Sequence, residues 1–152
     1  MNKKNTIIIL VVLIVAVAGI FFLASSGKKY KGTEVTFYKS FSCGCCGNYF
    51  PYLKKYGFRV KIIEVEDINE IKNQYGVPEN STSCHTTIIG NYFVEGHVPM
   101  EAIDKLLQEK PDIDGISLPN MPAGSPGMLG QKSEEFIILQ IKNGNSSEFM
   151  RI

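Results

Sequence analysis

The sequence lacks both an excess of one charge and any internal repeat. Its 152 residues carry 16 Lys and Arg against 15 Asp and Glu, a formal net charge of +1. Without Lys3 and Lys4, 14 basic side chains (16 minus 2) face 15 acidic ones, a net charge of −1. Nucleic-acid-binding domains usually carry a basic stripe, and disordered chains are usually highly charged and poor in apolar residues. The charge balance therefore argues against a nucleic-acid partner and against a disordered chain.

Charged residues are also missing between Asn5 and Gly27, where the run Ile7 to Ala24 is apolar. About 18 residues at helical rise span roughly 27 Å, close to the hydrocarbon thickness of a bilayer. No cysteine follows the run directly, which excludes a lipoprotein anchor. We expect residues 1–27 to be a membrane anchor, with a cleaved signal segment as the alternative. Lysines flank the run on both sides, so charge alone leaves the orientation open, but the short N-terminal tail favours an extracytoplasmic domain.

The rest of the chain predicts one α/β domain over residues 33–141, after a polar tether at residues 28–32 and before a frayed C-terminal tail at residues 142–152. Alternating or β-branched segments predict strands, and helical spacing between caps predicts helices. The expected strands are Glu34–Tyr38, Phe58–Val65, Thr86–Ile89, Tyr92–Glu95 and Phe136–Ile141, and the expected helices begin at Gly47, Ile68 and Pro99. A Pro/Gly-rich loop is expected at Asp114–Gly130. The order β-α-β-α-β-β-α up to that loop resembles the thioredoxin fold.

All four cysteines fall in two short segments, Cys43-Gly44-Cys45-Cys46 and Cys84-His85. Thiolates at a helix N-terminus have lowered pKa values and bind metals or attack disulfides. Four sulfurs and one imidazole would suit Cu(I), Zn(II) or an iron–sulfur cluster. A mononuclear zinc site needs four ligands, whereas a larger set with neighbouring thiols favours several Cu(I) ions. Zinc remains the alternative metal, and adjacent Cys45 and Cys46 disfavour an iron–sulfur cluster. The thioredoxin resemblance implies that the two segments meet in space.

Three further residues are candidate ligands of lower specificity. His97 lies in the Glu95-Gly96-His97 turn just ahead of a helix, where it could be a cap, a ligand or a support for a ligand. Met121 and Met128 flank the Pro/Gly-rich turn of the long loop, and thioether sulfur suits Cu(I). Packing or exposed methionines are common, so both interpretations stay open.

The strings YKSFSCGCCGNYF, SCHTTIIGNYFVEGHVP and GISLPNMPAGSPGM resemble the CopG-like metal-binding proteins of copper-resistance clusters. The resemblance extends over about Thr33 to Met128. It implies a thioredoxin-like fold, an extracytoplasmic location and copper handling by Cys43, Cys45, Cys46, Cys84 and His85 at one site. Tyr49 stands where a Trp would be expected, and the chain contains no Trp at all.

Two functions compete at this point. The first is a membrane-anchored copper(I)-binding protein of copper resistance or homeostasis. It would sequester copper and pass it on to exporting or chaperone proteins, or couple copper binding to thiol redox state. The second is a thiol–disulfide oxidoreductase in which Cys43 attacks and Cys46 resolves. Only the second is an enzyme, and it has no need of Cys45 or Cys84. A structural zinc module is a third, weaker interpretation.

Overall fold

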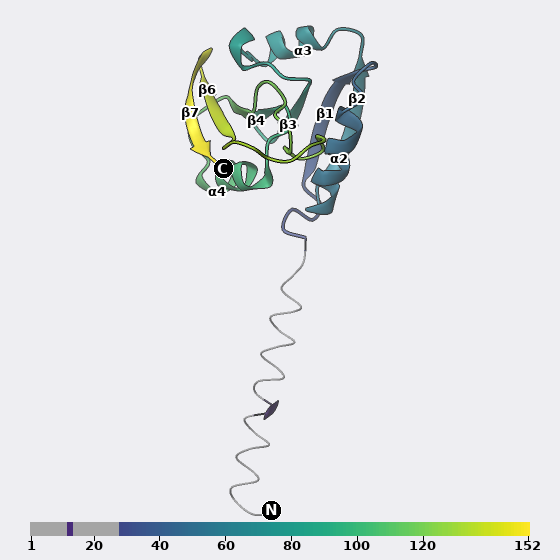
Figure 1. Ribbon diagram of the computed structural model, residues 1–152, viewed down its shortest axis with the longest axis vertical. Helices are drawn as coiled ribbons and strands as arrows, with labels where there is room; N and C mark the ends of the chain where they lie inside the picture. Colours follow the sequence, from purple (N-terminus) through teal and green to yellow (C-terminus); the bar gives the residue numbers. More distant parts are fainter. Residues whose placement is uncertain (1–11, 14–27) are drawn as a thin grey trace, which may run out of the picture.

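A seven-stranded mixed sheet flanked by helices forms the body of the protein (Figure 1). The computed structural model describes residues 12–13 and 28–152. The elements are β1 (Glu34–Ser40), α2 (Cys46–Lys55), β2 (Arg59–Val65), α3 (Ile68–Gln74), a 3-10 turn (Glu79–Ser81), β3 (His85–Ile89), β4 (Tyr92–Glu95), α4 (Met100–Glu109), β5 (Gly115–Ser117), β6 (Ile137–Lys142) and β7 (Asn145–Arg151). The strand order is β2-β1-β3-β4-β5-β6-β7. The predicted succession β-α-β-α-β-β-α is present from β1 to α4.

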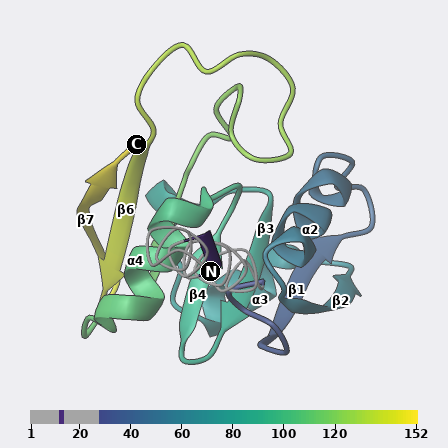
Figure 2. The ribbon, with the colours of Figure 1, turned by 90° about the horizontal axis from the view of Figure 1, so that it is seen from below.

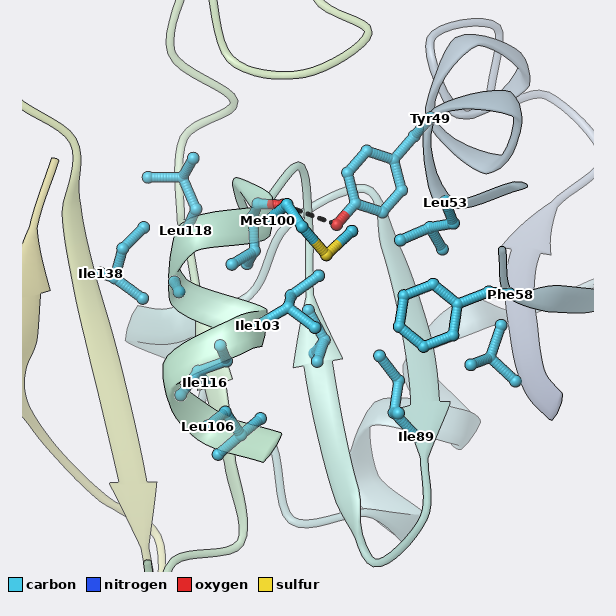
Figure 3. Close-up of a cluster of buried hydrophobic side chains, with 14 of the residues drawn as sticks. Tyr49, Leu53, Phe58, Ile89, Met100, Ile103, Leu106, Ile116, Leu118 and Ile138 are labelled. Atoms are coloured by element: carbon cyan, nitrogen blue, oxygen red, sulfur yellow. Dashed lines mark hydrogen bonds between the residues drawn. The ribbon is translucent and has the colours of Figure 1, made fainter. Parts of the chain in front are cut away.

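Helices α2 and α4 lie on one side of the sheet and α3 on the other (Figures 1 and 2). Helices α2 and α4 each bury residues spaced three or four positions apart, which is the pattern of an amphipathic helix packed on a core. Figure 3 shows Tyr49 and Leu53 of α2 directed towards Met100, Ile103 and Leu106 of α4 above the sheet. A smaller cluster around Val77, Phe93 and Ile141 fills the α3 side.

The C-terminal part of the sheet differs from the prediction. Residues 142–152 were expected as a frayed tail, but β7 pairs antiparallel with β6, and Phe136 and Ile152 exchange backbone hydrogen bonds of 2.9 and 3.1 Å. The prediction was wrong because it overlooked the Asn143-Gly144 turn between two strands, a common hairpin signal. The start of the expected loop, at Gly115–Ser117, is strand β5, held between β4 and β6.

The expected tether is also packed against the domain. The Tyr30 ring stacks on Phe58 with centroids 4.5 Å apart, and the Tyr30 backbone N–H donates to the Tyr56 carbonyl at 3.1 Å. The Tyr30 hydroxyl donates to Asp104, which also accepts from the Lys29 ammonium at 2.9 Å. Residues 28–32 therefore have a defined place against the connection between α2 and β2 and against α4, rather than linking two parts loosely.

The predicted anchor at residues 1–27 lies almost entirely outside the described residues. Within residues 12–13 and 28–152, no helix has the length and apolar character needed to cross a membrane. The anchor therefore stays a prediction.

Candidate metal centre

The first cysteine segment forms the connection from β1 to α2. Cys43 follows the strand after a short turn, and Cys46 is the first residue of α2 and fully buried. These two cysteines form a disulfide across the C-x-x-C spacing, with Cα atoms 5.6 Å apart. Cys45 is a free, half-buried thiol whose Sγ lies 3.8 Å from that of Cys43. The segment thus presents three sulfurs at the N-terminus of a helix.

The second segment meets the first because β3 pairs antiparallel with β1. The register places His85 opposite Lys39, so the residue before β3 lies beside the end of β1. Cys84 occupies that position as a free, half-buried thiol. The sulfur atoms of all four cysteines lie within 4.8 Å of one another. The predicted meeting of the two segments is therefore present in the fold.

A second group of donor atoms shares Cys84 with the first. The ligand atoms of Cys84, His85 and His97 also lie within 4.8 Å of one another. The Cys84 Sγ is 3.1 Å from the His85 Nδ1, and the two imidazole rings meet edge to face with centroids 4.9 Å apart. Both histidines are fully buried, and within the described residues neither Nε2 atom has a hydrogen-bond partner. Cys84 therefore joins a cysteine cluster to a pair of imidazoles.

His97 is oriented by the long loop that follows β5. Its Nδ1 lies 2.7 Å from the Pro126 carbonyl oxygen, and because a carbonyl only accepts, Nδ1 carries the proton. The Nε2 atom of the neutral ring then has a free lone pair. The next residue, Gly127, has φ +82°, and a Cβ there would lie 2.9 Å from the Asn48 carbonyl carbon. The glycine lets the loop pack directly on α2 beside the site.

Burial keeps these groups uncharged in the absence of metal. Burial, with the neighbouring His97 and Lys72, lowers the pKa of His85 well below its ordinary value. Burial also lowers the pKa of His97, against the effect of the hydrogen bond to Pro126. Burial and the adjacent Cys45 raise the pKa of the Cys84 thiol to about 12. Neutral imidazole is the form that binds metals, whereas the Cys84 thiol must give up a proton to become a ligand.

An ion pair beneath the site was not foreseen in the sequence. Lys72 of α3 and Glu95 of β4 are 3% and 0% exposed and in direct contact. The Glu95 carboxylate also accepts from the Ser83 backbone N–H and the Thr86 hydroxyl, both at 2.6 Å. These two partners flank Cys84 and His85, so the ion pair holds the ends of the second ligand segment. Glu95 could have been noticed because it lies two residues before His97. Nothing in the sequence around Lys72 indicates that it pairs with Glu95.

Tyr49, in the position where Trp was expected, supports both histidines. Its ring centroid lies 4.8 Å from that of His85 and 5.2 Å from that of His97. Its hydroxyl donates to the Val98 carbonyl at 2.7 Å, the contact drawn as a dashed line in Figure 3. The aromatic residue therefore connects α2 to the turn that carries His97.

The two methionines of the loop occupy different surroundings. Met121 is 36% exposed, and Met128, directly after Gly127, is half-buried. Their role as ligands stays a prediction. The donors that the fold brings together are four sulfurs and two neutral imidazoles, a soft set suited to Cu(I). The two buried Nε2 atoms, which have no hydrogen-bond partner among the residues that the structure describes, fit a role as ligands.

Comparison with known proteins agrees with this chemistry. Residues 81–128 match a family described as "Protein of unknown function, DUF411". Two solved structures, titled "Copper resistance protein copG- Form 1" and "Form 2", are each 35% identical to this chain. Each covers 78% of it, with 96% and 97% of their own chains aligned and TM-scores of 0.71 and 0.72. A search of curated proteins found no match.

Proposed function

The chain belongs to the family of the CopG copper resistance proteins, and we propose that it binds copper(I) as its cargo in copper resistance. The proposed ligands are the thiolates of Cys43, Cys45, Cys46 and Cys84 and the imidazoles of His85 and His97. The observation that carries the proposal is the position of Cys84, whose sulfur belongs to both groups of donors. Thiolates bridge Cu(I) ions readily, so a shared sulfur supports more than one ion per chain.

The disulfide supports coupling between copper binding and thiol redox state. While Cys43 and Cys46 are bonded to each other, neither sulfur is a thiolate ligand. A thiol reductant that supplies two electrons and two protons becomes a disulfide itself and leaves two thiols on this chain. Those thiols lose their protons on binding Cu(I). Reduction would therefore enlarge the ligand set from two thiols to four.

The proposal includes a place in the cell. An apolar run at residues 7–24 supports a retained anchor with the thioredoxin-like domain on the extracytoplasmic side. Disulfides persist in that compartment, in accord with the Cys43–Cys46 bond. Copper-exporting and copper-chaperone proteins are the proposed partners in transfer.

A direct test is anaerobic Cu(I) titration of the reduced full chain in detergent, with bound copper measured by elemental analysis after gel filtration. We expect several ions per chain, most of them lost in Cys45→Ser/Cys84→Ser. Ser42→Ala, which alters the same turn but removes no sulfur, serves as the control and should bind as the wild type does. Full copper loading of the double variant would contradict the proposal, and equally tight binding of zinc would favour a zinc module.

The C-x-x-C disulfide at the start of α2 supports one alternative, a thiol–disulfide oxidoreductase. In that case Cys43 and Cys46 alone would carry the reaction, and Cys84 would be dispensable. Insulin reduction by the metal-free protein separates the two functions. Turnover that persists unchanged in Cys84→Ser would support the oxidoreductase.

A further inference from the structure

The segment that enters the domain, residues 28–32, is held in place by close packing. A Cβ at Gly57, which has φ +107°, would lie 2.8 Å from the Lys28 Cβ and 2.9 Å from the Lys31 backbone nitrogen. Tyr30 adds its stack on Phe58 and its bond to Asp104. The point where the chain reaches the domain is therefore fixed at the C-terminal end of α2 (Figure 1).

Exposed basic side chains gather around this point. Two adjoining surface depressions share Lys54, Phe58 and Arg59 in their walls. We define the basic corner as the five cations that line them: Lys28, Lys31, Lys54, Arg59 and Lys61. Among residues 28–152, the ion pairs of the structure involve none of these five. Residues 1–27 contain no Asp or Glu, so the preceding segment offers them no partner either. Glu34 is the acidic residue in the same walls.

Strand β2 begins in the basic corner, and acidic residues lie around its other end. β2 begins at Arg59, and Glu64, Glu66, Asp67 and Glu70 lie at its end and in the start of α3. Lys39 pairs with Glu64 there, which leaves three acidic residues outside the ion pairs of the described residues. Seven residues of strand span roughly 20 Å, which separates the two groups of opposite charge. Figure 1 shows α3 on the far side of the domain from residues 28–33. The domain therefore has a positive end where the chain enters and a negative end opposite.

We propose that the basic corner rests on anionic lipid headgroups of the membrane that holds residues 1–27. The inference depends on the anchor in the proposed function. The apolar run ends at Ala24, and four residues of extended chain reach at most about 14 Å, so Lys28 lies close to the lipid surface. Because residues 28–32 are packed on the domain, the whole basic corner is held at that depth. Cations within a Debye length of an anionic leaflet are attracted to it, which matches the charge of the corner.

Such contact would leave the copper site open to the aqueous side. Cys46 and Lys55 stand at opposite ends of α2, roughly 14 Å apart along the helix. The sulfur cluster therefore lies away from the corner, within reach of a soluble copper donor or acceptor. The membrane contact would fix the direction in which the site faces.

The test uses the full chain in nanodiscs of phosphatidylcholine alone or of equal parts phosphatidylcholine and phosphatidylglycerol. Lysine acetylation, read by mass spectrometry, reports access to Lys28 and Lys31, with Lys132 and Lys142 as internal references. We expect labelling of the first two to slow several-fold in anionic discs only, and to recover in about 1 M salt, where the Debye length is about 3 Å. Equal labelling in both kinds of disc would overturn the proposal.

Charge variants complete the test. Lys54→Gln/Arg59→Gln/Lys61→Gln keeps both reporter lysines and should abolish their protection. Each cation near an anionic surface raises the binding constant for that surface about fivefold. The control Lys142→Gln/Arg151→Gln keeps Lys132 as the internal reference, removes two cations from β6 and β7 at the opposite edge of the sheet, and should keep the protection. Unchanged copper loading verifies that each variant is folded.

Co-elution with discs of phosphatidylcholine alone tests the anchor separately. A chain that inserts there but shows no lipid-dependent protection refutes the surface contact alone. A chain that does not insert refutes the anchor in the proposed function.

Discussion

The His97 Nδ1 and the Pro126 carbonyl oxygen lie 2.7 Å apart, although the two residues are 29 positions apart in the sequence. This contact selects the tautomer of His97 that directs a free Nε2 lone pair into the site. Hydrogen bonds to the remote nitrogen of a ligating histidine commonly fix its orientation and strengthen metal binding. The long loop is thus part of the site through a backbone carbonyl.

Displacing that loop should weaken copper binding. Gly127→Ala places a methyl group against the Asn48–Tyr49 backbone in a conformation unfavourable for alanine, so the Pro126 carbonyl must move. We expect copper affinity to fall about 10- to 100-fold, measured by competition with a chromophoric Cu(I) chelator. The ring ¹⁵N shifts of His97 should also report a changed tautomer. Gly90→Ala, at φ +60° with no close neighbours, is the matched control. Wild-type affinity together with a shifted tautomer would exclude His97 as a ligand.

Copper binding should depend on pH through Cys84. With its pKa raised to about 12, this thiol is protonated at neutral pH and releases its proton when it binds Cu(I). Apparent affinity should therefore fall as the pH is lowered, by up to about tenfold per pH unit for each proton released. Chelator competition at several pH values measures the slope, and Cys84→Ser should reduce it by about one proton. A slope that Cys84→Ser leaves unaltered would mean that this sulfur binds no copper.

The buried Lys72–Glu95 pair should contribute far more to the free energy of unfolding than an exposed ion pair does. Lys72→Met leaves the Glu95 carboxylate buried without its cation and should lower the free energy of unfolding by about 3–5 kcal/mol, measured by urea denaturation. Lys105→Met breaks the exposed pair with Glu109 and should cost about 0.3–0.5 kcal/mol. Lys72→Met/Glu95→Met should recover part of the loss. Equal effects of the two single variants would contradict a structural role for the buried pair.

The oxidised protein should bind less copper than the reduced one. In the disulfide form, thiol titration of the denatured chain should detect Cys45 and Cys84 alone, and four thiols should be found after reduction. Copper loading, determined by elemental analysis of both forms, should rise on reduction because two further thiolates become available. Cys43→Ser, which cannot form this disulfide, should show no such rise. Identical copper loading of the oxidised and reduced wild-type protein would mean that Cys43 and Cys46 are not copper ligands.

Local sequence patterns predicted most of the elements up to α4. The spacing of Tyr49 and Leu53, and of Ile103 and Leu106, reflects one buried helix face, which depends only on neighbouring residues. Strand β5 escaped prediction because three residues carry no periodicity, and its pairing depends on β4 and β6. Strand β7 escaped because its polar residues suggested a tail, despite the Asn143-Gly144 turn.

The sequence by itself determined the chemistry of this protein, since clustered thiols and an adjacent imidazole are soft donors in any conformation. It also determined the helix and strand periods. The resemblance to the thioredoxin fold already implied that Cys84 reaches the first cysteine segment. Only the tertiary structure decided that His97 joins it under the Pro126 carbonyl and that Lys72 lies under Glu95. It also placed residues 28–32 against the domain. These contacts depend on which strands pair and which faces pack, and such long-range choices leave no mark in the local pattern.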